Sequence, residues 1–580
     1  MLSYNRDNNI FFWSGSAAVR GQVGNGLFSI VNDFDINRIT AVKSGDKWKD
    51  NNQLDAELAY PFFDMMIPVF KVHSTYFADR QSGFLNNITE NSISTEVPLN
   101  IGRVAALKPV VGYKWDKRIA SPDDGVMQGL DAELYETRIG EYFGRVQGFL
   151  RNEKLDERVN RSQNLSVIVN RSFSVNAADT LSFNINRLRR DYYISATGGL
   201  ESRRESIKRL ANNLKYNLSE WGSVHIQAHV SSRDVDFSAI TGDMNGSLRS
   251  RNELQTYLNM VTNIDLGRQR GALYIKYDRN DQEHDTVTGM DVVYGMVPFD
   301  TRDNEGLVVE LGGRLSGNVG RSHGYSVESF IEKFQYNTPS ESNNDDHDQL
   351  RFGVKGAYSY MLSPTLILEV NSFVDLNHLV YIYQERSADN NWNRIIQAGT
   401  GVVYAQPSGV TVSGKYSVLA NYVDYDFDDR FAQIRSFIFR RFSMDYNVTY
   451  PFRQKGEFHA NLQVSMEENG LLQWDQFLQN RIIARKIAVG NLQYAYRWTE
   501  NCTLTPGFTF FRRFETQNQA TFSGLSRRLS AIRDNGVTLT VEYRVTPSAQ
   551  LHLYAARRFI NRGVEKEEFR YIDLSINWLF

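Results

Sequence analysis

The sequence predicts an all-β fold, a transmembrane antiparallel up-and-down β-barrel of about 26 strands, with a range of roughly 22 to 28. Three observations predict this fold. Apolar and polar residues alternate along almost the whole 580-residue chain, short turns recur at a regular spacing, and longer polar connections lie between those turns. The composition agrees, because 30 Tyr, 35 Phe and 41 Gly suit many strands joined by glycine-containing turns, and only 12 Pro are present.

The alternation separates two faces of each strand. In Val537–Val545 every second residue is apolar and the residues between are polar, which is the pattern of a strand with two unlike faces. Segments 273–278, 350–355 and 224–230 behave in the same way. Their polar positions are the candidate lumen-lining residues: Thr538, Thr540, Glu542, Arg544, Lys276, Asp278, Arg351, Lys355, His225 and His229.

Short turns divide the chain into β-hairpins. We expect their centres near residues 62, 100, 139, 176, 220, 268, 319, 363, 407, 453, 500 and 547. With long loops between them, these turns give about 26 strands, the first at 26–40 and the last at 567–580. Residues 1–22 are left as an N-terminal extension, periplasmic or luminal, with an extra strand as the alternative. Residues 23–580 form the barrel, with no separate plug domain.

The medium that each face of such a barrel contacts, water or lipid, determines where the protein is located. A soluble barrel hides its apolar face, whereas a membrane barrel turns that face towards lipid and encloses a polar lumen. The predicted strands are long enough to cross a bilayer, and aromatic residues cluster near their ends. Short turns at one end and long loops at the other are typical of periplasmic turns and extracellular loops. We therefore expect a bacterial outer-membrane protein, with a soluble β-propeller or β-solenoid as the alternative.

Several other features bear on location and partners. The first ten residues lack the basic and apolar segments of a signal peptide. The formal net charge of −2 argues against a nucleic-acid partner. Cys502 is the only cysteine, so no intrachain disulfide framework, all-cysteine metal site or covalent haem-attachment motif is present.

The search for reactive groups finds little. His225 and His229 lie four residues apart on one strand, too far for one metal ion to bridge. The acidic segment 343–348 lacks the spacing of an EF-hand calcium loop. No catalytic motif occurs in a plausible context, so we expect no enzyme, metal or cofactor. An outer-membrane hydrolase with a scattered site is the alternative.

Paired arginines recur along the chain: Arg189–Arg190, Arg203–Arg204, Arg440–Arg441, Arg512–Arg513, Arg527–Arg528 and Arg557–Arg558. Adjacent strand residues face opposite ways, so each pair is expected to send one guanidinium outwards. An outward arginine at the outer-leaflet boundary can bind lipopolysaccharide phosphates, while solvation at the rim is the alternative. The candidate lipopolysaccharide-contacting residues are Arg440, Arg441, Arg512, Arg513, Arg557 and Arg558.

The C-terminal strand alternates apolar residues up to a terminal phenylalanine, through Leu574, Ile576, Trp578 and Phe580. This ending resembles the last strand of Gram-negative outer-membrane β-barrel proteins. The resemblance implies that these four residues are recognised by the barrel-assembly machinery, and it implies lipid and lipopolysaccharide as surroundings.

The expected function is a large pore or translocation channel for solutes or polymer, or a sheath around a periplasmic or lumen-filling partner protein. The strands begin too early for the N-terminal plug that TonB-dependent receptors carry. In strand number and in the lack of a plug, the chain is similar to the porins of porin–cytochrome conduits, which implies a multihaem partner as one possibility. A structural or adhesion barrel that acts through its surface loops is another alternative.

Overall fold

The computed structural model describes residues 2–7, 10–41, 45–62, 67–79, 86–118, 121–193, 199–241, 248–286, 302–340, 343–428, 434–521, 524–546, 549–563 and 565–578. Strands form most of this part of the chain, and one helical turn, η3 (Ser387–Asp389), follows β20. None of the described helical residues forms a helix that is long and apolar enough to cross a membrane.

The strands of the first half are β1 (Leu2–Asp7), β2 (Ile10–Val23), β3 (Gly26–Ala41), β4 (Gly45–Ala59), β5 (Val69–Asp79), β6 (Asn86–Glu96), β7 (Leu99–Ile101), β8 (Ala105–Arg118), β9 (Ser121–Ile139), β10 (Tyr142–Leu155), β11 (Val159–Ser174), β12 (Ala177–Tyr193), β13 (Leu200–Ser219), β14 (Gly222–Thr241), β15 (Leu248–Asp265) and β16 (Gln269–Thr286). Those of the second half are β17 (Asn304–Val319), β18 (His323–Asn337), β19 (His347–Ser363), β20 (Leu366–Tyr381), β21 (Asn391–Ala405), β22 (Thr411–Tyr425), β23 (Phe437–Phe452), β24 (Gly456–Gln473), β25 (Leu478–Thr499), β26 (Cys502–Thr521), β27 (Gly524–Thr546), β28 (Ala549–Arg562) and β29 (Glu565–Trp578).

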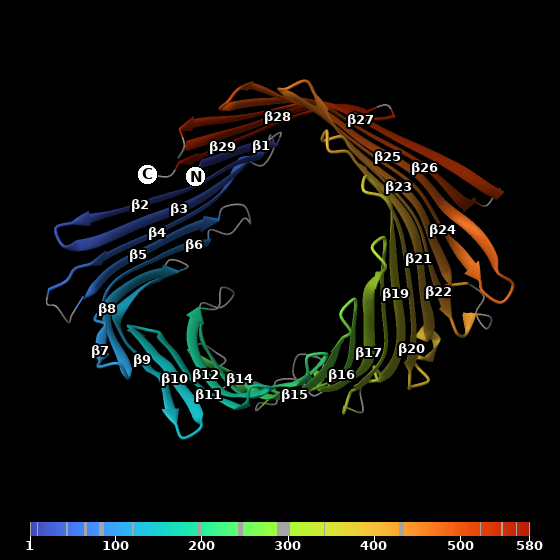
Figure 1. Ribbon diagram of the computed structural model, residues 1–580. Helices are drawn as coiled ribbons and strands as arrows, with labels where there is room; N and C mark the ends of the chain where they lie inside the picture. Colours follow the sequence, from blue (N-terminus) through green and yellow to red (C-terminus); the bar gives the residue numbers. More distant parts are fainter. Residues whose placement is uncertain are drawn as a thin grey trace.

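These strands form one sheet in which chain neighbours pair antiparallel. β6 and β7 both pair with β8, and the break between them lies opposite Pro109, which has no N–H to donate to a ladder. They therefore count as one interrupted strand, so the described residues form 28 strands across the sheet. The sheet curves round so that the N-terminal and C-terminal strands lie side by side (Figure 1). There β1 pairs with β2 on one side and with β29 on the other.

The N-terminal segment differs from the expected extension. Residues 2–7 and 10–23 are strands β1 and β2 of the sheet, so the extra-strand alternative for residues 1–22 is the one that the structure contains. The alternation of β2 is hidden because small residues such as Ser16, Ala17 and Ala18 occupy its middle. The strand count consequently lies at the upper end of the expected range.

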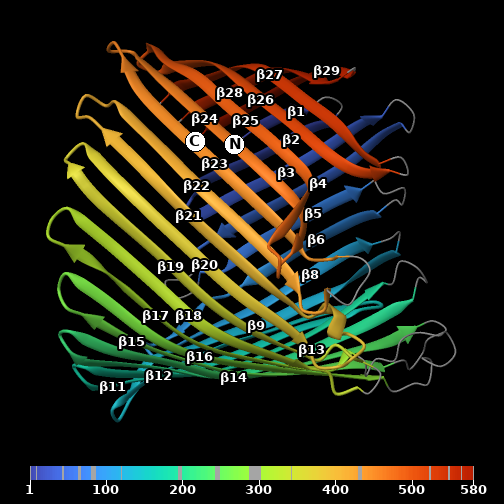
Figure 2. The same ribbon diagram turned by 90° about the vertical axis from the view of Figure 1, so that its right-hand side faces the viewer.

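The expected turns are confirmed at one end of the sheet. All twelve fall within two residues of an observed connection between strands, and a thirteenth connection, 24–25, joins β2 to β3. The opposite end is less uniform than expected, because its connections range from short ones at 156–158 to a long one at 287–303. The strands run steeply across the wall between these two ends (Figure 2).

Candidate functional site

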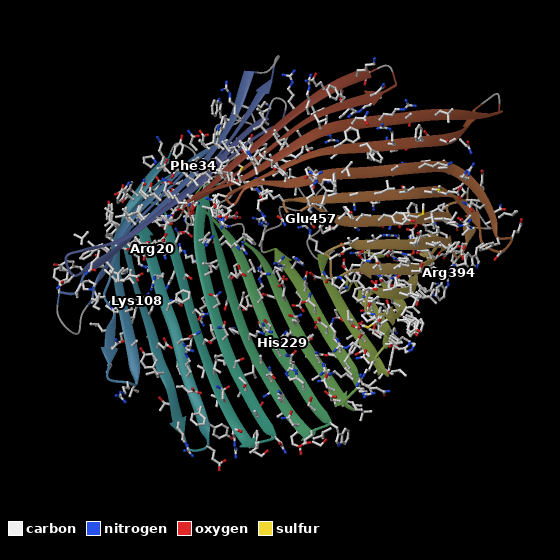
Figure 3. The ribbon with its side chains drawn as sticks, turned by 45° about the horizontal axis from the view of Figure 1, so that its top comes forward. Arg20, Phe34, Lys108, His229, Arg394 and Glu457 are labelled. Atoms are coloured by element: carbon white, nitrogen blue, oxygen red, sulfur yellow. The ribbon has the colours of Figure 1, made fainter. Side chains whose placement is uncertain are left out.

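The sheet has two chemically different faces. In β27, Val537 and Leu539 are 54% and 40% exposed, whereas Thr538 between them is 8% exposed. On the same face as Val537, other strands carry exposed apolar side chains such as Leu165, Leu210 and Leu311. We call this the apolar face and the opposite one the polar face. Figure 3 shows the side chains along the strands, with Lys108 and His229 labelled.

All ten candidate lumen-lining residues lie on the polar face, and the strand register brings several of them together. His229 is paired with Tyr257, and Tyr257 with Asp278, across β14, β15 and β16. Lys276 and Arg351 lie in one row, separated by two glutamates of β17 and β18. The polar face therefore carries rows of polar side chains in register across this part of the wall.

The histidines make hydrogen bonds and ring contacts within this face. His225 Nε2 lies 2.6 Å from Asn213 Oδ1, and the His229 ring stacks on Tyr257 with centroids 4.8 Å apart. Their separation along β14 agrees with the expectation that they do not share a metal ion. Within the described part of the chain, no group of three metal-ligating side chains comes together.

The charged candidates differ in how far they are paired. Arg351 binds Asp375 through two nitrogens, with Nε–Oδ1 at 3.0 Å. Asp278 accepts a hydrogen bond from Gln255 at 3.1 Å. In β27, Thr538 is buried, and Glu542 and Arg544 line a hollow of about 410 Å³, as does His552 of β28. Thr540 and Lys355 also lie on the polar face, at register positions opposite Tyr554 and Glu328. Their lining of a lumen stays a prediction.

A row of alternating charges crosses six neighbouring strands and was not predicted. Lys71 of β5 lies 3.2 Å from Glu57 of β4 and 3.1 Å from Glu96 of β6. Lys108 of β8 continues the row, 3.2 Å from Glu96 and 2.9 Å from Asp131 of β9. Arg151 of β10 then pairs with Asp131. Three cations and three anions alternate along this row, which we call the ion-pair row.

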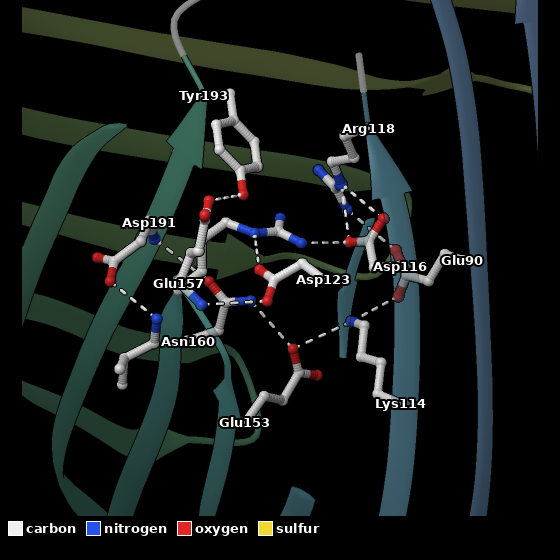
Figure 4. Close-up of polar contacts among 12 residues, drawn as sticks. Glu90, Lys114, Asp116, Arg118, Asp123, Glu153, Glu157, Asn160, Asp191 and Tyr193 are labelled. Carbon is white, nitrogen blue, oxygen red and sulfur yellow. Dashed lines mark hydrogen bonds and ion pairs between the residues drawn. The ribbon is translucent and has the colours of Figure 1, made fainter. Parts of the chain in front are cut away.

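A second cluster lies where β8 and β10 end and β9 begins, next to the 156–158 connection (Figure 4). Arg158 donates to Asp123 at 2.7 Å through Nε and to Asp116 at 3.0 Å through Nη2. Lys114 pairs with Glu90 at 2.7 Å and with Glu153 at 3.0 Å. We call these residues the buried cluster.

Burial makes this cluster unusual for a charged group. The side chains of Arg158 and Asp116 are 1% exposed, and that of Asp123 is fully buried. Burial lowers the pKa of the Arg158 guanidinium, but its hydrogen bonds to Asp123 and Asp116 outweigh this effect, so the pKa lies above its usual value. Arg158 is therefore a permanent cation that holds two carboxylates together. Such a triad is costly to break, because one missing partner leaves uncompensated buried charge.

The arginine pairs split between the faces. Arg440, Arg512 and Arg557 share the apolar face, and Arg441, Arg513 and Arg558 the polar face. Several already have protein partners: Arg512 donates to Asn535 at 2.7 Å, and Arg557 binds Glu568 at 2.9 Å. Arg558 pairs with Asp534. Contact of these six arginines with lipopolysaccharide stays a prediction.

The C-terminal strand is paired on both sides. Leu574 and Ile576 lie opposite Leu553 and Leu551 of β28, and Leu574 also lies opposite Tyr4 of β1. Trp578 ends β29 and lies opposite Ala549, while Phe580 is outside the described residues. Nothing in this geometry tests the role of the four residues in assembly, which stays a prediction.

The two faces together fix the environment of the wall. In lipid every backbone polar group needs a partner, so a spanning sheet must pair its strands and turn its apolar side chains outwards. A sheet of paired antiparallel strands, with exposed apolar residues on one face and ion pairs on the other, has the pattern of a transmembrane β-barrel wall.

Comparison with known proteins gives distant likenesses. No protein-family model and no curated protein matches the chain. Among solved structures, the outer membrane transporter YddB from Escherichia coli has a TM-score of 0.37 at 8% identity, over 94% of this chain and 84% of that chain. The siderophore receptor PirA from Pseudomonas aeruginosa has 0.35 at 8%, over 85% and 80%. A ferric enterobactin receptor from Pseudomonas aeruginosa has 0.37 at 9%, over 89% and 80%. Likenesses of this size assign neither a family nor a function.

Proposed function

We propose that this chain is a wide outer-membrane transport barrel whose polar face lines the interior. The observation that carries the proposal is the wall itself, which has 28 strands, an ion-paired polar face and an exposed apolar face. Among the described residues, strands and their connections account for nearly all, and none forms a separate plug domain. The pairing of β1 with β29 supports a closed wall.

The strand number sets the width. A barrel of 28 strands, about 4.8 Å apart and tilted by about 40°, would have a Cα diameter on the order of 55 Å. Barrels of about 16 to 18 strands already enclose an aqueous channel, and diameter grows roughly linearly with strand number. The interior is therefore wide enough for a large solute, a polymer or a folded partner protein.

The chemistry of the polar face indicates what such an interior tolerates. The ion-pair row alternates in sign, so its charges largely neutralise each other at short range. A wall of this kind exerts little net attraction on ions of either sign. It suits neutral or mixed-charge cargo, or the surface of a partner protein, better than a selective ion pathway.

Reconstitution of the purified chain into planar bilayers tests the proposal. An open barrel has a cross-section about three times that of a 16-stranded porin, so we expect large single-channel conductance with weak ion selectivity. Liposome swelling with neutral sugars of increasing size gives the size limit. A purified barrel that neither conducts nor admits sugars would refute an open channel and favour a structural or adhesion role.

The width also favours a second form of the proposal, in which a partner protein fills the barrel. Mild-detergent extraction from native membranes followed by mass spectrometry identifies such a partner, and haem staining tests for a multihaem cytochrome. Conductance that rises when the partner is stripped off supports the sheath. Extraction of the barrel alone, with conductance unchanged, contradicts it.

A further inference from the structure

A group of cations on the apolar face stands near the ends of three adjacent strands. Arg161 of β11 is paired in register with Arg189 of β12, and Arg189 is paired with Arg204 of β13. Arg187 lies two residues before Arg189, and Lys208 four residues after Arg204, so both share this face. We call these five residues the basic patch.

The alignment of three arginines is costly in isolation. Side chains directly opposite on neighbouring strands have Cβ atoms about 4.5–5.5 Å apart, and like charges at such positions destabilise a sheet. No row of this kind forms on the polar face between β4 and β10, where the charges alternate in sign. The repulsion in the basic patch therefore requires compensating negative charge.

The protein supplies only part of this compensation. Arg189 binds Asp191 at 3.0 Å, Lys208 lies 3.8 Å from Asp234, and Arg161 lies beside the uncharged amide of Gln163. Arg187 and Arg204 are exposed and have no hydrogen-bond or ion-pair partner among the described residues. Asp236 lies opposite Arg204 in register but forms no ion pair with it among the described contacts. The patch keeps a positive excess even when all three aspartates are counted.

The position of the patch adds a second requirement. On the same face of β11 and β13, exposed Leu165 follows Arg161 and exposed Leu210 follows Arg204 and Lys208, so both leucines lie on the side away from the chain's longer connections. A hollow of about 280 Å³ is lined by Arg161, Arg187 and Arg204, and also by Asp234 and Asp236. A ligand that fits both features carries phosphate groups next to acyl chains.

We propose that the basic patch binds the phosphate groups of an outer-leaflet glycolipid, as lipid A presents them, with its acyl chains over Leu165 and Leu210. Guanidinium groups bind phosphate oxygens bidentately, and an exposed pair on neighbouring strands can bind one phosphate from two sides. The assignment rests on the outer-membrane location and on the outward direction of the apolar face. It concerns arginines other than Arg512 and Arg557, which already have protein partners.

The test uses the purified full chain in detergent and native mass spectrometry, with diphosphorylated lipid A as the probe. We expect the double variant Arg187→Gln/Arg204→Gln to bind about ten-fold more weakly than the wild type, since it loses two charge-assisted contacts. Arg190→Gln is the matched control, because it removes one exposed guanidinium from β12 on the opposite face; it should change binding by less than about two-fold. Arg187→Lys/Arg204→Lys keeps the charge and should give an intermediate loss.

The proposal would be overturned by unchanged binding in the double variant, by equal loss in Arg190→Gln, or by equal binding of dephosphorylated lipid A to the wild type. Displacement of lipid A by millimolar inorganic phosphate would show a site for the free anion and would also overturn the lipid assignment. Heat-modifiable migration on gels reports folding, and Arg187→Gln alone carries the test if the double variant does not fold. Because binding is measured without conductance, its failure is separate from failure of the transport proposal.

Discussion

Replacement of Arg158 by methionine is the sharpest test of the buried cluster. The substitution removes a guanidinium that bonds to Asp123 at 2.7 Å and to Asp116 at 3.0 Å, in a site where all three side chains are essentially excluded from solvent. It leaves Asp116 and Asp123, which lie opposite each other on β8 and β9, without the cation that bridges them, while Asp116 keeps its contact with Arg118. Breaking a buried ion pair by removal of one partner costs about 3–5 kcal/mol.

The assay is hydrogen exchange of backbone amides near the ends of β8, β9 and β10. A loss of about 3–5 kcal/mol in local opening free energy accelerates exchange there by roughly 150- to 5,000-fold. Arg118→Met is the matched control, because Arg118 also binds Asp116, at 2.9 Å, but its side chain is 35% exposed. Its loss should cost less than about 1 kcal/mol.

A rescue variant completes the test. Arg158→Met combined with Asp116→Asn and Asp123→Asn removes the charges together, and should recover most of the lost protection, because replacement of a whole buried ionic group by neutral residues is often tolerated. If exchange in Arg158→Met were no faster than in Arg118→Met, the assignment of the cluster as a local stabilising centre would be wrong.

Three further predictions follow from the wall. Cysteines at Tyr4 and Leu574, paired across β1 and β29, should form a disulfide that shifts mobility on a non-reducing gel, and no crosslink would contradict the pairing of the two chain ends. Lys108→Met removes the cation that Glu96 and Asp131 share, so the reversal potential in a salt gradient should shift towards cation preference. Glu96→Gln should shift the reversal potential in the opposite direction. Identical reversal potentials in the two variants would place the ion-pair row outside the conduction path. Ile576→Asn should reduce the protease-resistant, membrane-assembled fraction in cells, with Ser575→Asn as the control on the opposite face, and equal assembly of both would argue against the C-terminal signal.

The sequence predicts the periodic features of this wall and misses the features that depend on register. Turns such as those near 268 and 407 carry glycine or proline, which specify local backbone conformation, so their positions are confirmed within two residues. β2 was expected only as the alternative to an N-terminal extension, because its small residues give weak alternation. An extended strand is defined by one segment of the chain, and alternation suffices to find it only where side chains differ in polarity.

Contacts between strands require information that no single segment carries. Lys71 meets Glu96, and Lys108 meets Asp131, across pairings whose alignment a shift of one residue would invert. Arg158 lies in a short connection, where a lone arginine in a sequence reads as a solvated residue, and only the approach of β8 and β9 buries it. The basic patch was found only in part for the same reason: Arg189 and Arg204 were noticed as members of pairs, but not as register partners.

The short strand β1 determines whether the strands at the two ends of the chain pair parallel or antiparallel. β1 runs antiparallel to both β2 and β29, so β2 and β29 themselves run in the same direction. A ring of alternating up and down strands can return to its start only with an even number of members, and β1 supplies the last one with six residues. Removal of those residues would leave an odd ring, in which β2 and β29 could meet only through the slanted hydrogen bonds of a parallel pair. This six-residue strand thus determines whether every pair of neighbouring strands in the wall can be antiparallel.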